Sequence, residues 1–188
     1  MNKQEMKHNY QRKGTLQGTS QYNKQNYKQR QYDDLIKEWH NTQEYFNGIQ
    51  RYIPDSIKYD IMNLGEIDLK PLETPYLFEI VNEDSLNLAI KYIKEGFNPL
   101  VLNMASDYRP GGGVATGKTA QEEEIFRRSN AHQTHPPTWY PLNEFEIIYS
   151  PEVTVIKDSR DKKYNLIDEI AVSMIACAAI RKPQLVKG

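Results

Sequence analysis

The chain has 188 residues, a length that suits one domain with a tail, and its formal net charge is −1. Hydrophobic residues make up 38% and the mean hydropathy is −0.76, so part of the chain is too polar to join a compact core. The sequence lacks an apolar run long enough to span a bilayer, and its single cysteine, Cys177, excludes an internal disulfide. It also lacks the apolar stretch of a signal peptide, so we expect a soluble, non-secreted protein of the cytoplasm, or of the nucleus in a eukaryote.

The polar excess lies in residues 1–32, which are rich in Gln, Asn, Lys and Tyr and show no apolar periodicity. Seven Lys and Arg stand against one Glu, so this segment carries +6 and the rest of the chain carries −7. A polar, low-complexity segment buries too little apolar area to offset its ordering entropy. We therefore expect a disordered basic arm, mostly a solvated tail, with at most weak contact to nucleic acid or another polyanion.

An N-terminal helical extension is expected over residues 33–74. DDLIKEWHNTQEYFNG begins with acids, which favour a helix start, and ends at Gly48, a residue typical of helix termination. The core domain should occupy residues 75–188. Its predicted elements, in chain order, are a strand at 75–81, a helix at 83–97 with Asp84 or Ser85 as N-cap, a buried strand at 98–105, a helix near 120–130, two short strands at 145–150 and 153–158, and a strand at 169–179.

This alternation predicts an α/β fold, with helices on the faces of a mixed, mostly parallel sheet. Ligands of such sheets bind at the carboxyl ends of strands, and a glycine-rich loop follows the strand at 98–105. The loop and its continuation read RPGGGVATGKTAQEEE over residues 109–124. Within it, GGVATGKT matches the P-loop pattern G-x-x-x-x-G-K-[ST], and NLIDE at 165–169 could supply a metal-binding acid.

Two features argue against a P-loop for ATP or GTP. SDYRP separates the strand from the first glycine, whereas a P-loop strand runs almost directly into it. Glu122, Glu123 and Glu124 would also share the helix start with a triphosphate. One pair of like charges at about 4 Å costs roughly 4 kcal/mol at an effective dielectric constant near 20.

A long ligand explains why glycines suited to a phosphate stand close to glutamates, which would repel one. Glycines let the backbone approach a diphosphate, while the acids, about ten residues on, would face a sugar beyond it. ADP-ribose has this shape. Cleavage of a glycosidic bond needs a carboxylic acid to protonate the leaving oxygen and a carboxylate to steady the cation or activate water. Adjacent glutamates can separate their pKa values so that one stays protonated near neutral pH.

The GGG, seven residues, then QEE pattern resembles the signature of poly(ADP-ribose) glycohydrolases, most closely of their microbial branch. The blocks VLNMASDYRPGGG (101–113), AQEEEIFRRS (120–129) and IIYSPEVTVIKD (147–158) also agree, so the resemblance covers about 75–180. It implies a macrodomain-like, three-layer αβα fold and hydrolysis of ribose–ribose O-glycosidic bonds, which releases ADP-ribose from poly(ADP-ribose) or from ADP-ribosylated protein. It implies no metal and no cofactor.

The resemblance also assigns roles to residues. Gly111, Gly112 and Gly113 would form the loop over the diphosphate, and Asn103 would hydrogen-bond the terminal ribose. Gln121 and Glu122 would place that ribose, with Glu123 as the catalytic general acid and base and Glu122 beside it. Because the acidic run is three residues long, Glu124 is the alternative acid.

Purely structural roles are the competing interpretation of these residues. Thr119 and Glu122 have the spacing of a capping box, and Glu123 with Arg127 and Glu124 with Arg128 have the spacing of helical ion pairs. His132 and His135 are interpreted as loop residues and Lys118 as a solvated lysine. A module that only binds ADP-ribose is the alternative function. Family members continue beyond the segment at 169–179, so we expect a sheet that is incomplete at its C-terminal side, with a partner covering it.

Overall fold

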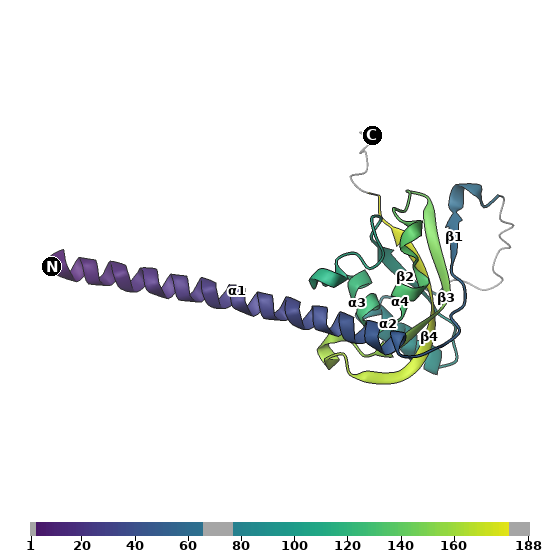
Figure 1. Cartoon of the computed structure of the whole chain (residues 1–188), viewed down its shortest axis with the longest axis horizontal. Helices are drawn as coiled ribbons and strands as arrows, with labels where there is room; N and C mark the ends of the chain where they lie inside the picture. Colours follow the sequence, from purple (N-terminus) through teal and green to yellow (C-terminus); the bar gives the residue numbers. More distant parts are fainter. Residues whose placement is uncertain (1–2, 66–76, 181–188) are drawn as a thin grey trace.

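The computed structural model describes residues 3–65 and 77–180, with side chains from residue 25 onward. Residues 66–76 and 181–188, which include parts of the predicted extension, of the strand at 75–81 and of the core domain, lie outside the described residues. Four α-helices and four strands make up an α/β structure in the described part (Figure 1). They are α1 (Lys3–Asn47), β1 (Ile57–Asp60), α2 (Ser85–Lys94), β2 (Leu100–Ala105), α3 (Gln121–Arg128), α4 (Ala131–Thr134), β3 (Glu146–Lys157) and β4 (Leu166–Ala178).

Helix α1 begins at Lys3, not near residue 33, and extends far beyond the rest of the molecule (Figure 1). The arm that the sequence predicts to be disordered is therefore helical from Lys3 to residue 32. Its Gln, Lys and Arg side chains have good helix propensity and it contains no proline, so nothing stops the helix that starts in the docked part. The docked part ends at Asn47, as Gly48 predicts.

The sheet is mixed and has the strand order β1-β3-β4-β2. In the described residues β1 pairs antiparallel with β3, and β3 antiparallel with β4, while β2 pairs parallel with β4. The expectation of a mostly parallel sheet is thus wrong. Only residues 158–165 separate β3 from β4, too few for the crossover that a parallel pair needs.

Two strand predictions need correction. The segments at 145–150 and 153–158 form one strand, β3, because a bulge between Ser150 and Val153 accommodates Pro151. Residues 77–81 form no strand, although their composition favours one. Leu77, Phe78 and Ile80 are 90%, 89% and 102% exposed, so no neighbouring strand gives this segment a ladder to join.

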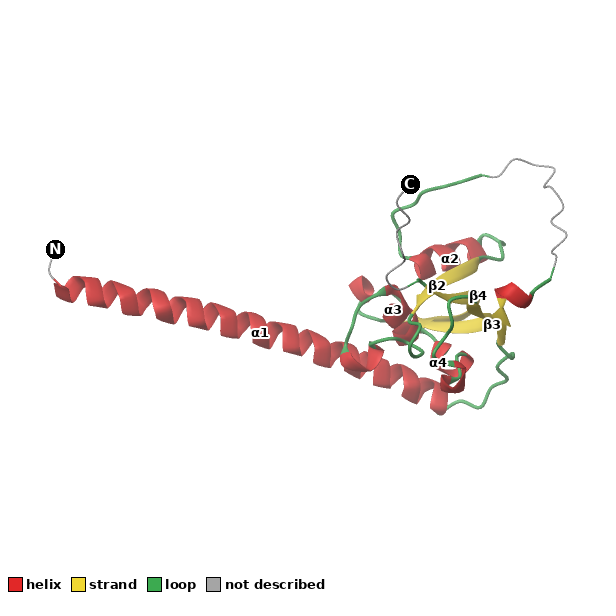
Figure 2. Cartoon of the chain, turned by 90° about the horizontal axis from the view of Figure 1, so that it is seen from above, coloured by secondary structure: helices red, strands yellow, loops and turns green. Residues whose placement is uncertain are grey.

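One face of the sheet carries the hydrophobic core. All four α-helices of the described part contribute to it, α2 through Leu86 and α3 through Phe126, for example. On the sheet side the core includes Val101 of β2, Val155 of β3 and Met174 of β4. Figures 1 and 2 show α2, α3 and α4 gathered beside the sheet, and the docked end of α1 against them.

The opposite face of the sheet is apolar and open. Leu100, Leu102 and Met104 of β2 point to it and are more than half exposed, and Ile175 lies beside Leu102 in the ladder. The mixed α/β architecture is as predicted. The second helical layer of a three-layer sandwich, however, is not found among the described residues.

Candidate active site

The predicted site residues meet at the carboxyl ends of the parallel strands β2 and β4. A hollow of about 570 Å³ lies there, lined by residues 104–109 after β2, by the glycine turn, by the first turn of α3 and by Ala179. This is the place where an open sheet binds ligands.

The glycine turn is shaped for close contact with helix α3. Gly111 and Gly112 have positive φ angles of 71° and 51°, which favour glycine. A Cβ atom on Gly111 would lie 2.6 Å from the ring of Phe126, and one on Gly112 would lie 2.8 Å from the Glu123 carboxyl. The three glycines therefore let the turn lie directly against the glutamates.

The amides of this turn are occupied by the protein's own carboxylates. Gly111 donates its N–H to Glu122 Oε1 at 3.1 Å, and Gly113 donates to Glu123 Oε1 at 2.8 Å, while Gly112 donates to the Arg109 carbonyl at 3.3 Å. This geometry removes the P-loop interpretation, because the anions at these amides are side chains. The expected cradle of backbone amides over a diphosphate is not formed here either; the turn positions the glutamates.

Glu122 is held on both carboxyl oxygens. Its second oxygen accepts the Ser106 N–H at 2.8 Å, and the side chain is buried. Burial raises the pKa of Glu122 to about 7; N–H donors from Ser106 and Gly111 oppose the rise, and the charge of Glu123 adds to it. The N-cap of α3 is Ala120, so Glu122 does not form the capping box with Thr119.

Glu123 differs from Glu122 in having one carboxyl oxygen without a partner. The residue is 7% exposed, and its Oε2 is buried with no hydrogen bond among the described residues, although the side chain lines the hollow. An unpaired buried oxygen is costly, which favours a ligand group at this position. Its predicted ion pair with Arg127 is absent from the described contacts.

Glu124 is turned away from the hollow and is bound elsewhere. One of its oxygens accepts the Tyr164 hydroxyl at 2.6 Å, and the other pairs with Arg127 at 3.2 Å. This i,i+3 pair replaces the predicted partner, Arg128. Glu124 therefore has a structural role, and the register of the helix favours Glu123 as the acid that faces the hollow.

Asn103 is fully buried at 0% exposure, and neither polar atom of its amide has a hydrogen-bond partner among the described residues. The amide lies near the Glu122 carboxyl and lowers its pKa. Gln121, by contrast, is fully used within the protein. Its oxygen accepts the Met104 N–H at 2.8 Å, and its nitrogen donates to Ser85 and to the Leu102 carbonyl.

Two cationic residues, Arg109 and Lys118, also line the hollow. Lys118 is exposed, as predicted, and its stem lies over the Cα of Gly113. Sequence reasoning missed the Ser106 amide and the half-buried Tyr140. The buried hydroxyl of Tyr140 has no hydrogen-bond partner among the described residues, and its pKa is raised by burial and by the Glu122 charge. The Ser106 amide could have been found from its position directly after a buried strand. The sequence carries no signal for the role of Tyr140.

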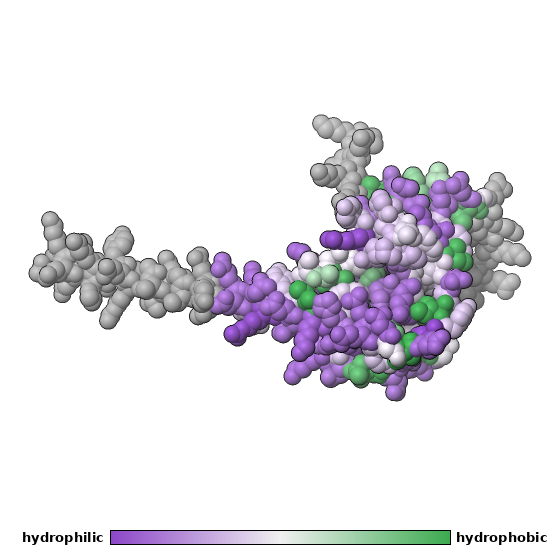
Figure 3. All heavy atoms as spheres, viewed as in Figure 1, coloured by the Kyte–Doolittle hydropathy of each residue, from purple (hydrophilic) through white to green (hydrophobic). Residues whose placement is uncertain are grey.

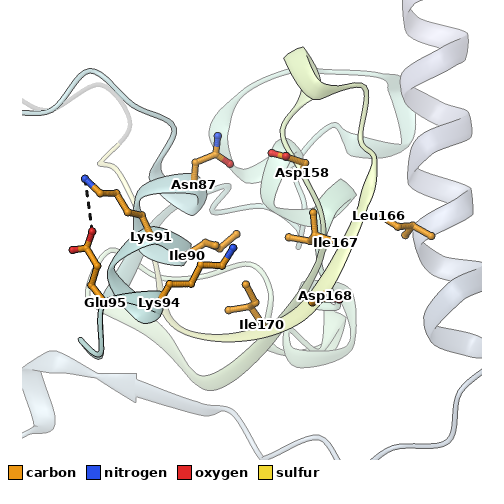
Figure 4. A pocket seen from close by; sticks show the side chains of 10 residues that line it. All are labelled: Asn87, Ile90, Lys91, Lys94, Glu95, Asp158, Leu166, Ile167, Asp168 and Ile170. Atoms are coloured by element: carbon orange, nitrogen blue, oxygen red, sulfur yellow. Dashed lines mark ion pairs between the residues drawn. The ribbon is translucent and has the colours of Figure 1, made fainter.

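A second, larger hollow of about 860 Å³ lies between α2 and β4 and contains none of the predicted site residues. Figure 4 shows isoleucines 90, 167 and 170 around it, with Lys91 and Glu95 forming an ion pair on α2 at 4.0 Å. It has no acid next to an unsatisfied buried amide, so it lacks the chemistry of the first hollow.

Two buried arginines fix α3. Arg127 donates to the Leu35 carbonyl of α1 at 3.2 Å, and Arg128 pairs with Asp84 at 2.7 Å and donates to the Lys157 carbonyl at 3.1 Å. The docked part of α1 and the N-cap of α2 thereby hold the helix that carries the acids.

Of the two histidines predicted to be loop residues, His135 lies outside the helices, as predicted, whereas His132 belongs to a helix. His132 lies in α4 with its ring 5.3 Å from that of Trp39, and His135 is fully buried after α4. Burial lowers the pKa of His135 to about 4. No group of three or more His, Cys, Asp and Glu side chains suited to a metal ion occurs in the described part of the chain.

Fold and site together define an α/β protein with paired buried carboxylates at the carboxyl ends of parallel strands. The family model described as the catalytic domain of microbial-type poly(ADP-ribose) glycohydrolase matches residues 2–158. The chain belongs to this family.

One solved structure agrees in fold, and two others match over a smaller part of the chain. The poly(ADP-ribose) glycohydrolase of Thermomonospora curvata is similar at a TM-score of 0.65 and 22% identity, over 77% of this chain and 64% of that chain. The Deinococcus radiodurans glycohydrolase in complex with ADP-ribose matches at 28% identity and a TM-score of 0.46, over 54% of this chain and 44% of that chain. The Thermomonospora enzyme bound to the inhibitor ADP-HPD matches at 29% identity and a TM-score of 0.43, over 54% and 42%.

The chain thus spans less than two thirds of the Thermomonospora structure. No curated protein matches the sequence. Within the described residues, no helix has the length and apolar character needed to cross a membrane.

Proposed function

We propose that this chain is the catalytic part of an enzyme that hydrolyses ribose–ribose O-glycosidic bonds in poly(ADP-ribose) and releases ADP-ribose. The observation that carries the proposal is that Glu123 lines the hollow with a buried Oε2 that has no partner among the described residues, next to the buried Glu122, whose carboxyl lies near the Asn103 amide. Family membership and the fold of the Thermomonospora enzyme support it.

In this proposal Glu123 is the general acid. It protonates the 2′-oxygen of the departing unit and then activates water against the anomeric carbon. Glu122, fixed by the amides of Ser106 and Gly111, keeps the neighbouring sugar in place and keeps a second negative charge beside the oxocarbenium-like transition state when it is ionised. Asn103 donates to and accepts from ribose hydroxyls.

The diphosphate is assigned to side chains and not to the glycine amides. Arg109 and Lys118 line the hollow and present positive charge at its rim, where a flexible, hydrated phosphate group can meet them. In this proposal glycines 111–113 and Gln121 do not contact the ligand. They position the glutamates and the end of β2, which do. The proposal needs no metal and no cofactor.

A module that binds ADP-ribose without cleaving it is the second candidate. The Glu123 carboxyl distinguishes the two functions, because a binding module does not need an acid at the glycosidic oxygen.

Replacement of single carboxyls tests the proposal. Glu123→Gln should lower the rate of polymer hydrolysis by at least about 10²–10⁴-fold, the contribution of a general acid, while ADP-ribose still binds in calorimetry. Glu124→Gln is the matched control and should keep the rate within a few-fold, because residue 124 contacts Tyr164 and Arg127. Undiminished hydrolysis by Glu123→Gln would exclude the mechanism, and binding without hydrolysis by the unmodified chain would support the binding module.

The proposal also covers the source of the substrate, the location of the protein and a protein partner. ADP-ribosylated protein is an alternative source of the same substrate. A cytoplasmic or nuclear location is proposed from the cysteine usage, and a polypeptide partner is proposed for the open face of the sheet.

A further inference from the structure

The outer part of α1 is a helical arm that starts at the rim of the candidate site. Residues 25–30 are exposed, and burial in α1 begins only at Leu35. Figures 1 and 2 show the helix leaving the molecule in both views, and Figure 3 shows that the outermost described side chains of the helix are hydrophilic.

The arm carries charge of the opposite sign to the rest of the chain. Residues 1–32 hold +6 and the remainder −7. Lys28 and Arg30 are exposed, and the basic run ends at Asp33 and Asp34, just before the helix docks. The net charge of −7 on the rest of the chain disfavours a polyanion within a Debye length of about 8 Å at physiological salt, whereas the net charge of the arm attracts one.

Packing places the root of the arm beside the site. A Cβ atom on Gly117 would lie 2.9 Å from the Cα of Tyr32, so the arm leaves the body at the loop that joins the glycine turn to α3. Lys118, the next residue of that loop, lines the hollow. The arm is therefore within reach of a polymer that has one unit in the hollow.

We propose that this basic arm binds the part of the poly(ADP-ribose) chain that extends beyond the unit in the hollow. The inference rests on the proposed function and names a second contact for the same substrate. Each unit of the polymer carries a diphosphate and an adenine. The exposed Lys28 and Arg30 bind diphosphates, and Tyr27, which is 64% exposed, stacks on an adenine.

The arm is longer than one ADP-ribose unit, so it can contact several units of a polymer. Thirty helical residues extend about 45 Å at 1.5 Å each. Contacts spread along this length act together with the site, so the affinity for a long chain exceeds the affinity for its terminal unit.

Charge reversal tests the arm without touching the site. The arm variant carries Lys24→Glu, Lys28→Glu and Arg30→Glu. The control variant carries the same charge change at exposed or half-exposed lysines elsewhere, with Lys37→Glu, Lys91→Glu and Lys94→Glu. Binding of ADP-ribose is measured by calorimetry, and binding of poly(ADP-ribose) of about twenty units by fluorescence anisotropy at several salt concentrations, with the slow Glu123→Gln background.

The arm variant should bind ADP-ribose like the control but bind the polymer at least about tenfold more weakly, with a shallower salt dependence because fewer cations meet phosphates. Equal polymer affinities of the two variants would overturn the inference. So would tighter binding of polyadenylate RNA than of poly(ADP-ribose) by the arm. Failure of the proposed function has a different signature, since the unmodified chain would then not hydrolyse poly(ADP-ribose), whichever of the two variants binds the polymer.

Discussion

The two faces of the sheet differ although the same strands build both. On β2, Val101, Asn103 and Ala105 point to the covered face, where helices pack and the acids gather. Their neighbours Leu100, Leu102 and Met104 point to the open face and stay exposed. Residues of one strand thus separate into a packed, chemically active side and an apolar side that no described helix covers.

The comparison teaches that the candidate site depends on one face only. Every contact that fixes Glu122 and Glu123 comes from the glycine turn, the end of β2 and helix α3, all supported from the covered side. The open face has the composition of an interface, since exposed apolar patches and free strand edges invite pairing.

The largest expected contrast between the faces is in core packing. Met174 is fully buried on the covered face, so Met174→Ala should lower the free energy of unfolding by about 2–5 kcal/mol. Ile175→Ala, one residue along β4 on the open face, should cost less than about 1 kcal/mol. Urea unfolding followed by circular dichroism measures both, and equal losses would show that the two faces are packed alike.

Titration on the covered face should give opposing effects on stability. The raised pKa of Glu122, about 7, stabilises the fold below pH 4.5 and this stabilisation is lost as pH rises through 7. The lowered pKa of His135, about 4, stabilises the fold above pH 6.5 and this stabilisation is lost as pH falls through 4. Each is worth roughly 3 kcal/mol at most.

Glu122→Gln separates the two titrations. The unmodified chain should keep a fairly flat stability between pH 4.5 and 6.5, since the two effects oppose each other there. The variant should instead lose stability steadily as pH falls through this window, by up to about 3 kcal/mol. Unfolding midpoints across pH provide the measurement, and parallel profiles for the two proteins would contradict the assigned Glu122 pKa.

The glycine turn should be sensitive to a single methyl group. Gly111→Ala adds a Cβ that would meet Phe126 at 2.6 Å in a left-handed conformation, so we expect a loss of about 1–3 kcal/mol and a displaced Glu122. Gly65→Ala is the control, because Gly65 has a similar φ of 63° with no atom within 4 Å of the added Cβ. Equal losses of unfolding free energy in the two variants would show that the contact between the glycine turn and α3 does not contribute to stability.

The smallest expected change in stability comes from the open face. Leu102→Lys with Met104→Lys places two charges at half-exposed positions, so the free energy of unfolding should change by less than about 1 kcal/mol. Self-association at high concentration should fall, as seen by light scattering. A large destabilisation would mean that the chain covers this face itself.

Local patterns predicted single helices and strands better than they predicted how the strands pair. Helices α2 and α3 and strands β2 and β4 follow from their periodicity and caps, with Asp84 as the N-cap of α2. The strand at 75–81 failed because a strand needs a partner, which composition does not reveal. The hairpin of β3 and β4 could be predicted from a connection too short for a crossover.

The side-chain roles near the site depended on contacts across the chain. The spacing of Glu122, Glu123 and Glu124 fits capping and ion pairs equally well, and only the folded turn shows that Gly111 and Gly113 donate to the first two. The same contacts occupy two of the amides that the sequence assigns to a diphosphate. Tyr164, forty residues from Glu124, carries no sequence signal for its hydrogen bond.

Calorimetric titration with ADP-ribose and with magnesium-ATP, side by side on this chain, tests the central claim most directly. If the glycine amides hold the protein's own carboxylates, ADP-ribose should bind without magnesium and ATP should show no magnesium-dependent binding. Tight magnesium-dependent ATP binding that disappears in Lys118→Ala would contradict the account, because the turn would then have to release both glutamates to a triphosphate.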